Sequence, residues 1–330
     1  MKTEPTIYIN ELKHKPQEFL FYMHQFVEAG RRAGFVAIKE HASPKHLFRR
    51  IMPVVLFFLN TLHLYRLRRH PLIITSRGSG ILEAAYPHYF HYHIIPMLWD
   101  TWPKEQDWLF KDLRRLKCPL VMVTARQMAI RIEQELKIKS IWIPEGIDTQ
   151  GFSKGGNLVT RPIDVYELGR QHAQYHKVVT AAIAKGCVNS WVGNTYGENG
   201  VLIKLACSTA EELKDTLAKS KIVVCFPKVD TDSIEVSGNI ETLTQRYWEA
   251  MLSRSLPVGR APRELTDLIG YNPVIDVDWD HPEKQLADIL TNISAYQSLV
   301  DKNYDTALKM ASWDGRMDKI NEVIAENLQA

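Results

Sequence analysis

The chain has 330 residues, of which 45% are hydrophobic and 24% are charged. This composition is globular, excludes a disordered chain or a coiled coil, and leaves room for two domains of ordinary size. The net charge of +3 is uneven, because residues 1–150 hold 22 basic and 14 acidic residues and the remainder holds 19 basic and 24 acidic ones. A basic first half indicates contact with an anionic surface, unless the asymmetry is chance. Since no nucleic-acid recognition motif accompanies it, nucleic acid is not expected as a partner.

Cysteine usage and the terminus predict a cytoplasmic protein. Cys118, Cys187, Cys207 and Cys225 form no C-x-x-C pair and lie beside apolar segments, which is typical of reduced thiols rather than of a zinc site. The N-terminus lacks the apolar core of a signal peptide. No run of about 18 apolar residues occurs, so we expect no membrane-spanning helix.

The first half alternates apolar strand patterns with helical patterns. Because the strands are continuous apolar runs, they suit a parallel sheet covered by helices on both faces. The strands are predicted at 35–40, 72–76, 94–99, 120–125 and 140–145, and the helices near 15–33, 44–69, 104–116 and 125–137.

A second alternating set follows a Gly-rich polar segment at 148–162, which we interpret as a linker. The sequence therefore predicts an α/β protein with two Rossmann-like domains in series, residues 1–150 and 151–330, and an interdomain cleft. The second-half strands are predicted at 163–169, 189–193, 201–206, 221–227, 256–260 and 273–278. Its helices are predicted near 172–186, 209–219, 243–254, 262–269, 281–298 and 302–328.

Residues 238–264 carry the most informative pattern. Glu241 and Glu249 stand eight positions apart, with the polar run 242–245 between them opening into a helix. Free N–H groups at such a helix start, including those of Thr244 and Gln245, form an anion site suited to a diphosphate. A carboxylate one turn inside the helix can accept hydrogen bonds from a ribose diol, and one before the loop can accept them from a sugar. Two solvated glutamates flanking a helix are the alternative.

This segment resembles the E-x7-E signature of retaining glycosyltransferases of the glycosyltransferase-B fold, close to family 4 and its capsule and cell-wall relatives. The resemblance implies that Glu249 binds the donor ribose and that Glu241 contacts the donor sugar as a catalytic residue. The family usually has E-G-F-G in the loop, whereas this chain has Glu241 followed by Thr, Leu and Thr244. Losing two glycines leaves the backbone less free to approach the phosphates.

Three further segments share the resemblance, which covers roughly residues 140–325. Gly169-Arg170 and Lys177 follow the first strand of the second domain, where the family clamps the donor diphosphate with an arginine and a lysine. An exposed helix lysine is the alternative for Lys177. The run IPEGIDTQGF at 143–152 resembles the family's exit from the first domain. The run SWDGRMDKINEVI at 312–324 resembles its closing helix, which packs back on the first domain.

The first domain offers fewer signals for an acceptor site. In TSRGSG, Gly78 and Gly80 follow a strand and allow a substrate group to approach, or they simply form a strand–helix turn. In LWDTWP, Asp100 stands where family relatives often carry an H-D pair, with Trp99 in place of the histidine. Asp100 can bond a sugar hydroxyl, act as a base, or cap the next helix. Trp99 is predicted to lie beside Asp100 in the acceptor cleft.

Two other features of the first domain concern metal binding and membrane contact. His88, His91 and His93 are not expected to bind metal, because no carboxylate joins them at ligand spacing. Residues 43–71 are apolar in the middle and basic at both ends. They form either a buried helix or a helix on an anionic membrane surface at the inner face of the membrane. In the second case Lys45, Arg49, Arg50, Arg66, Arg68 and Arg69 would face the headgroups.

The resulting hypothesis is a glycosyltransferase that moves a sugar from a nucleoside-diphosphate sugar to a glycan or lipid-linked acceptor. The resemblance implies retention of configuration, no cofactor and no required metal. One rival is a metal-dependent glycosyltransferase of the other major fold, since Asp230-Thr231-Asp232 imitates a D-x-D metal site. The other rival is a non-catalytic nucleotide-sugar-binding module or partner subunit.

Overall fold

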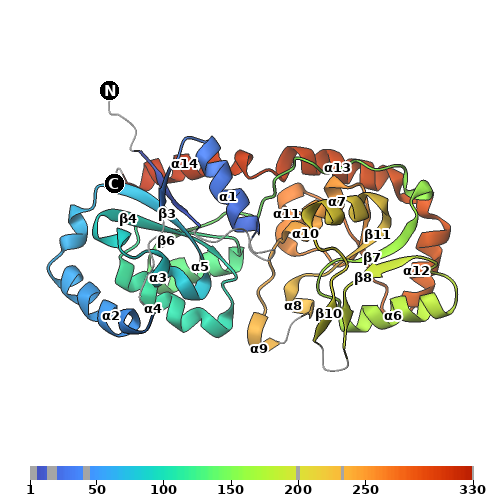
Figure 1. The fold of residues 1–330 in the computed structure, drawn as a ribbon, viewed down its shortest axis with the longest axis horizontal. Coiled ribbons are helices and arrows are strands. Elements are labelled where there is room, and N and C mark those ends of the chain that lie inside the picture. Colours follow the sequence, from blue (N-terminus) through green and yellow to red (C-terminus); the bar gives the residue numbers. More distant parts are fainter. Residues whose placement is uncertain (1–5, 13–20, 40–44, 198–200, 232–233, 329–330) are drawn as a thin grey trace. The chain divides into compact units, whose positions relative to one another are not determined.

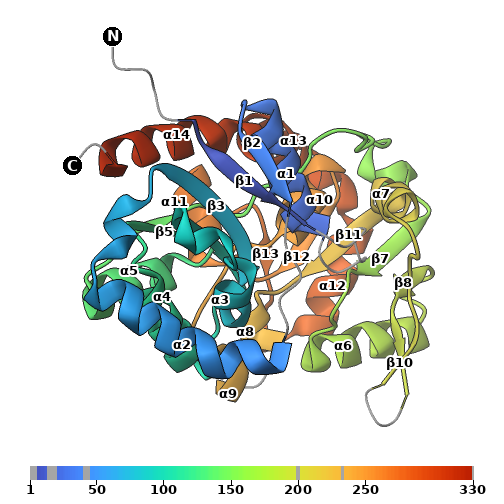
Figure 2. The same cartoon turned by 60° about the vertical axis from the view of Figure 1, so that its left-hand side comes forward.

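The computed structural model describes residues 6–12, 21–39, 45–197, 201–231 and 234–328 (Figure 1; Figure 2 shows the same ribbon turned by 60°). The chain forms two compact units. Unit 1 contains residues 1–145, 234–240 and 313–330, and unit 2 contains residues 146–233 and 241–312. Each unit is built around its own parallel sheet, so the predicted fold class, α/β with two Rossmann-like domains, is confirmed.

The sheet of unit 1 has six strands, all parallel, in the order β2-β1-β3-β4-β5-β6. Because β2 lies on one side of β1 and β3 on the other, the chain reverses direction across the sheet between β1 and β3. Ligands of open parallel sheets bind at such a switch point, beyond the carboxyl ends of the strands. The strands are β1 (Tyr8–Glu11), β2 (Val36–Lys39), β3 (His70–Arg77), β4 (Tyr92–Trp99), β5 (Leu120–Val123) and β6 (Lys139–Trp142).

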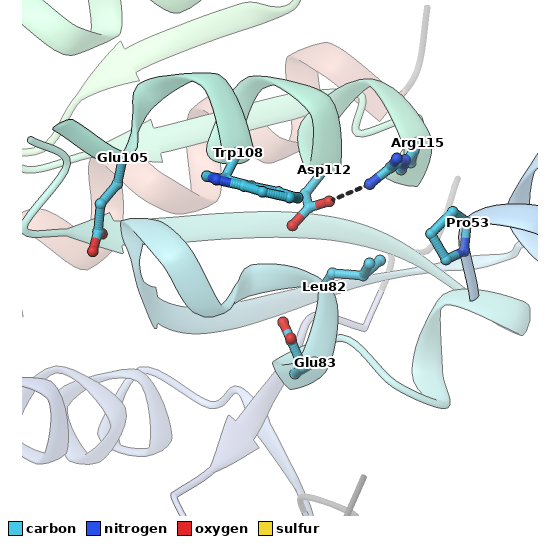
Figure 3. A pocket seen from close by; sticks show the side chains of 7 residues that line it. All are labelled: Pro53, Leu82, Glu83, Glu105, Trp108, Asp112 and Arg115. Carbon is cyan, nitrogen blue, oxygen red and sulfur yellow. Dashed lines mark hydrogen bonds and ion pairs between the residues drawn. The ribbon is translucent and has the colours of Figure 1, made fainter. Parts of the chain in front are cut away.

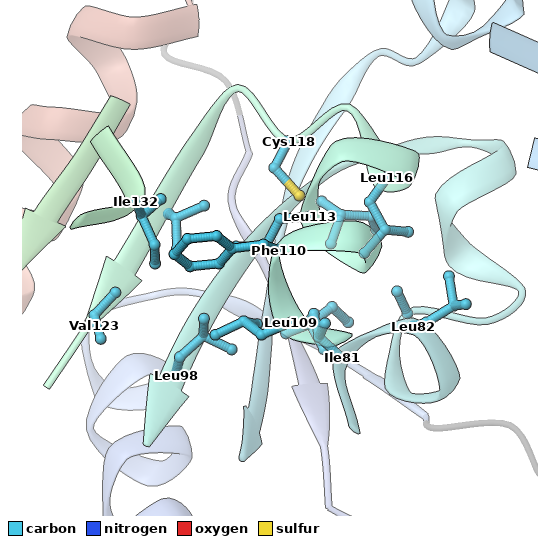
Figure 4. Packing of buried hydrophobic residues seen from close by; sticks show 14 of the residues in the cluster. Ile81, Leu82, Leu98, Leu109, Phe110, Leu113, Leu116, Cys118, Val123 and Ile132 are labelled. Carbon is cyan, nitrogen blue, oxygen red and sulfur yellow. The ribbon is translucent and has the colours of Figure 1, made fainter. Parts of the chain in front are cut away.

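Helices cover both faces of this sheet because alternate strand residues point to opposite sides. In β3, Leu72 and Ile74 enter one apolar cluster and Ile73 enters the other. Figure 4 shows the first cluster, where α4 lies over the sheet. The α-helices are α1 (Phe21–Arg32), α2 (Lys45–Thr61), α3 (Ile81–Ala84), α4 (Gln106–Leu116), α5 (Arg126–Leu136), α9 (Ile234–Ser237) and α14 (Asp314–Leu328). Short 3-10 turns are η1 (Leu64–Leu67), η2 (Gly78–Gly80), η3 (His88–Phe90) and η4 (Pro103–Glu105).

The main sheet of unit 2 has five parallel strands in the order β13-β12-β11-β7-β8, with its switch point between β7 and β11. Its strands are β7 (Ile163–Glu167), β8 (Trp191–Gly193), β11 (Ser220–Cys225), β12 (Leu256–Gly259) and β13 (Ile275–Asp276). A small antiparallel pair joins β9 (Thr195–Tyr196) to β10 (Leu202–Lys204). The helices are α6 (Ala173–Ala184), α7 (Ala210–Lys219), α8 (Lys228–Thr231), α10 (Gln245–Leu252), α11 (Arg263–Ile269), α12 (Pro282–Thr291) and α13 (Gln297–Met310), with 3-10 turns η5 (Leu158–Thr160) and η6 (Ile293–Tyr296).

The Gly-rich segment at 148–162 is packed onto unit 2 by one buried arginine. Arg161 is 4% exposed, and its guanidinium donates to the carbonyl oxygens of Ser220 at 2.8 Å and Ser253 at 2.9 Å. A further bond at 3.1 Å reaches the carbonyl of Gly156. Burial, followed by the nearby Arg254, lowers the pKa of Arg161 to about 10. This segment is therefore an integral part of the second unit.

Several elements of the structure differ from the predictions, and among the described residues three differences affect the arrangement of the fold. The strand β1 was missed, because its four residues are too few to give a clear period. Residues 201–206 were predicted as a strand of the parallel set, but β10 pairs only with β9. The helix predicted at 302–328 is two helices, because the chain breaks at 311–313, where Ser312 bridges to Ile147 and Trp313 is buried in unit 1.

Candidate active site

The carboxyl edge of the unit 2 sheet gathers the residues that the sequence associated with the donor. At the switch point, Gly169 follows β7 with φ +70°, a conformation that favours glycine. A Cβ atom at Gly169 would lie 2.9 Å from Nη2 at the end of the Arg246 side chain, so the Arg246 guanidinium lies directly against this loop. The β7–α6 loop and the start of α10 are therefore adjacent, and Arg246 brings a guanidinium to their junction.

Glu249 lies on α10, one turn from Arg246, and is only partly exposed. Desolvation by burial raises the pKa of its carboxyl to about 7, although Arg246 and Lys214 of α7 act in the opposite direction. The Glu249 carboxylate has lost part of its hydration, and the two nearby cations do not fully compensate for that loss. It is suited to accept hydrogen bonds from a polar ligand such as a diol.

Glu241 is held in a network of charges before α10. Its Oε1 accepts from Nη1 of Arg260, and its Oε2 accepts from the backbone N–H of Arg263 at 3.0 Å. Arg260 also forms a bidentate pair with Asp230, at 2.6 and 2.9 Å. Burial alone would raise the pKa of Glu241, but the Arg263 N–H and Arg260 hold it below its ordinary value. Glu241 is therefore an ionised carboxylate fixed in place by its neighbours.

The other predicted donor residues occupy different positions around this edge. Arg170 is exposed and follows Gly169 in the β7–α6 loop, whereas Lys177 is exposed on α6. Thr244 is the N-cap residue of α10, and its hydroxyl makes no capping bond. The side-chain amide of Gln245 donates to the carbonyl of Gly146 at 2.9 Å, which fixes the first residue of the helix. The start of α10 therefore lies at this edge, and a helix N-terminus is the kind of position at which proteins bind anions.

Sequence reasoning missed several side chains of this edge. Arg246 and Lys214 supply the positive charge near Glu249. His172 stacks on Phe226 with ring centroids 4.2 Å apart, which joins the loop after β7 to the end of β11. The three-residue spacing of Arg246 and Glu249 on a helix was a usable signal for one of them. Lys214, His172 and Phe226 are far apart in sequence, and only the strand order of the parallel sheet brings them to this edge.

The corresponding edge of unit 1 gathers a second polar cluster, next to the switch point between β1 and β3. Arg77 ends β3, Asp100 follows β4, and Tyr22 lies on α1 after β1. The Tyr22 hydroxyl lies 3.4 Å from Oδ2 of Asp100, and Nε of Arg77 lies 3.6 Å from the same atom. Burial, followed by the Asp100 carboxylate, raises the pKa of Tyr22.

The backbone of Asp100 is held in an unusual conformation. Its φ of +49° is left-handed, and it caps no helix, because the N-cap positions of η4 and α4 are Trp102 and Glu105. The helix-capping alternative for Asp100 is therefore wrong. Non-glycine residues in this region store strain, which is common at functional sites.

The neighbouring predicted residues divide into two groups. A Cβ at Gly78 would lie 3.2 Å from the carbonyl oxygen of Asp100, and one at Gly80 would lie 3.3 Å from the Ser76 hydroxyl, so both allow close packing beside the cluster. Trp99 is 2% exposed and its ring packs on Phe26 and Trp313. Its assignment to a cleft was wrong, because the alternation along β4 turns its side chain into the core.

The structure also bears on the suggested metal sites. Asp230 of the D-x-D imitation is bound by Arg260, and Asp232 lies outside the described residues. In the part of the chain that the structure describes, no group of three or more His, Cys, Asp or Glu side chains is arranged to hold a metal ion.

Comparison with known proteins places the fold. The sequence matches no known protein family and no curated protein. The structure is similar to sucrose-phosphate synthase from Thermosynechococcus elongatus, with a TM-score of 0.63 at 12% identity, over 98% of this chain and 99% of that one. It is also similar to Anabaena HepE in complex with UDP and glucose, with a TM-score of 0.60 at 12% identity over the same shares. The chain has the glycosyltransferase-B fold.

Proposed function

We propose that the protein is a glycosyltransferase that moves a sugar from a nucleoside-diphosphate sugar to an acceptor hydroxyl. The observation that carries this proposal is the edge of unit 2, where Glu249, with its raised pKa, lies one turn from Arg246 beside the Gly169 loop. A carboxylate for a ribose diol, cations for a diphosphate and a helix start occur together there. The similarity to HepE, whose structures include a complex with UDP and glucose and a complex with UDP-glucose, supports the same donor class.

In this proposal unit 2 holds the donor. Glu249 accepts from the ribose hydroxyls, and Arg246, Arg170, Lys177 and the N–H groups at the start of α10 neutralise the diphosphate. As the bond to the leaving phosphate breaks, the same cations stabilise the negative charge that develops on it. This role of the arginines and the helix start is the basis for proposing transfer without a metal. Retention of configuration rests on the resemblance of the E-x7-E segment alone.

Unit 1 holds the acceptor in this proposal. Asp100, with Tyr22 and Arg77 beside it, can accept a hydrogen bond from an acceptor hydroxyl or take its proton. The acceptor is proposed to be a glycan or a lipid-linked sugar in the synthesis of cell-surface polysaccharide or glycolipid. Glycosyl transfer of the hexosyl type is the corresponding reaction class.

A non-catalytic nucleotide-sugar-binding module is the second candidate, and one observation favours it. Both carboxylate oxygens of Glu241 are engaged, one by Arg260 and the other by the Arg263 N–H. A glutamate tied in this way supports the architecture of the loop even if it never touches a sugar. Donor binding without transfer to any acceptor would favour this candidate.

Calorimetric titration with UDP, GDP, ADP and TDP, without added metal, tests the donor site. We expect one nucleotide to bind, and we expect Glu249→Ala and Arg246→Ala to weaken its binding at least about tenfold. Glu211→Gln, on the exposed first turn of α7, is the matched control and should bind as the parent does. If the folded protein binds none of the four nucleotides, the proposed function is wrong.

A further inference from the structure

An apolar face on the outside of unit 1 has no partner in the described chain. Ile51, Val54, Phe57 and Phe58 of α2 are exposed, as is Leu62 directly after the helix, with Phe57 at 65% and Leu62 at 66%. At helical spacing these positions share one side of the helix, while Leu56 on the other side is fully buried in the core. Leu64 and Leu67 of η1 are also exposed and extend the same run, Leu67 at 70%. We name the exposed side chains of α2 and η1 together the α2–η1 face.

The surroundings of this face are basic. Residues 41–82 contain seven Lys or Arg and no Asp or Glu. Arg66 and Arg69 are exposed at the η1 end. Helix α4 presents exposed Lys111 and Arg114, followed directly by exposed Lys117, and one exposed carboxylate, Asp107, in its first turn. Arg68, predicted to face headgroups, is instead buried and donates to the carbonyl of Leu116 at 2.8 Å. This bond holds the η1 segment against the carboxyl end of α4, which brings the η1 cations close to that end of the helix.

Helices α2 and α4 are joined at their carboxyl ends and separated by a hollow nearer their middles. The Asn60 side chain donates to the carbonyl of Arg115 at 2.9 Å, which fixes the end of α2. Figure 3 shows the hollow, which has a volume of about 270 Å³ and is lined by Pro53, Leu82 and the ring of Trp108. Three acidic side chains near this face, Glu83, Glu105 and Asp112, line that hollow, and Asp112 is paired with Arg115. Among residues 51–69 the exposed side chains are apolar, basic or uncharged, and none is a carboxylate.

We propose that the α2–η1 face docks onto an anionic lipid membrane surface. An amphipathic helix whose apolar side is exposed, bordered by arginines and aromatic side chains, lies in the plane of the membrane interface. Phe57 and Phe58 enter the acyl boundary, while Arg66, Arg69 and the α4 cations meet the phosphate groups. No helix of the described residues is long and apolar enough to cross a membrane. Docking at the surface is therefore the mode that fits these elements.

Charge favours a membrane over a second copy of the chain. In a symmetric dimer the same patch faces itself, so the cations that border the α2–η1 face would oppose one another. No carboxylate within residues 41–82 is available to pair with them. An anionic bilayer supplies both an apolar layer for the phenylalanines and negative charge for the arginines. The proposal stands apart from glycosyl transfer, because it uses none of the residues assigned to the donor or acceptor.

Sedimentation with vesicles tests the proposal on the full-length protein. We expect binding to vesicles of equal parts phosphatidylglycerol and phosphatidylcholine, weakened by salt, and little binding to phosphatidylcholine alone. The variant Phe57→Ser/Phe58→Ser/Leu62→Ser should weaken this binding at least about tenfold, since it removes most of the inserted apolar surface. Arg66→Gln/Arg69→Gln should weaken it about 20-fold, because each cation near the surface contributes roughly a fivefold factor.

The matched control is Ile130→Ser, which replaces a residue of α5 that is 50% exposed and should leave vesicle binding unchanged. Circular dichroism of each variant confirms that it is folded. Absence of sedimentation with the anionic vesicles overturns the proposal, as does equal sedimentation of the triple serine variant. Analytical ultracentrifugation tests whether a second copy of the chain occupies the face instead. If the parent is a dimer, the triple variant is a monomer and neither protein binds vesicles, the face is a dimer interface and the membrane proposal is wrong.

Discussion

Replacing Glu249 by glutamine should stabilise the protein at neutral pH while removing its ability to bind a nucleotide. Burial raises the pKa of this carboxyl from 4.5 to about 7. Between these two values the folded state holds a proton that the unfolded chain has released, so the free energy of unfolding falls as the pH rises. At about 1.4 kcal/mol for each pH unit, the full effect over these 2.5 units is about 3.5 kcal/mol. Because Glu249 is partly exposed, we expect about 2 to 3 kcal/mol.

Glutamine has the same shape as a protonated glutamic acid and cannot ionise. The free energy of unfolding of Glu249→Gln should therefore equal that of the parent near pH 4, where both side chains are neutral. The difference in favour of the variant should grow from pH 4.5 to 7 and then stay constant. Hydrogen exchange of the α10 amides measures the opening free energy of this part of unit 2 in both proteins at each pH. Glu211→Gln, an exposed substitution in the same unit, should stay within about 0.5 kcal/mol throughout. An advantage that is the same at pH 4 and pH 8 would refute the reasoning, because it could not come from ionisation.

Three further predictions follow from the same structure. Nucleotide affinity should be full above pH 7 and fall about tenfold per pH unit below it, since the ribose is bound by the Glu249 carboxylate; calorimetry from pH 5.5 to 8 measures this, and a flat profile would contradict it. Arg161→Met should cost about 3 to 4 kcal/mol of unfolding free energy in urea melts, because several buried carbonyl groups lose their donor, whereas a loss below about 1 kcal/mol would show that water replaces it. Asp100→Asn should reduce transfer at least about 100-fold with nucleotide affinity unchanged, and a change in affinity instead would remove Asp100 from the acceptor side.

Strands buried on both faces are continuous apolar runs in the sequence. The alternation of such runs with helical patterns was therefore sufficient to predict two parallel sheets. The donor-side motif was predictable for a similar reason. Glu241, Glu249 and the start of α10 are close in sequence, so the local order of strand, loop and helix is visible in the chain itself. What that order could not show is the state of each carboxylate. Arg260 fixes Glu241 from nineteen positions away, and Lys214 approaches Glu249 from another helix.

The first unit shows the opposite case. Trp99 and Asp100 are adjacent in sequence and were assigned to one cleft, yet the pleat sends Trp99 into the core while Asp100 stays at the edge. The end of this strand was predicted at the correct residue, but a continuous apolar run does not show on which face each of its side chains lies. Tyr22 falls in a helix that the sequence predicted, but its role was missed because it meets Asp100 only after 78 positions of chain.

The two edges differ in how their charge is balanced, and this difference bears on their chemistry. At the edge of unit 2, Glu241 has its charge met by Arg260 and a backbone N–H, whereas Glu249 keeps a raised pKa despite two cations nearby. A carboxylate whose charge is already neutralised by the protein mainly stabilises the local structure. A carboxylate with fewer protein partners gains more binding free energy when a ligand supplies the missing hydrogen bonds. In unit 1, Asp100 meets Tyr22 and Arg77 only at 3.4 and 3.6 Å, and its backbone is strained. By this reasoning Glu249 and Asp100 gain most from a bound ligand, one on the donor side and the other on the acceptor side, and Glu241 gains least.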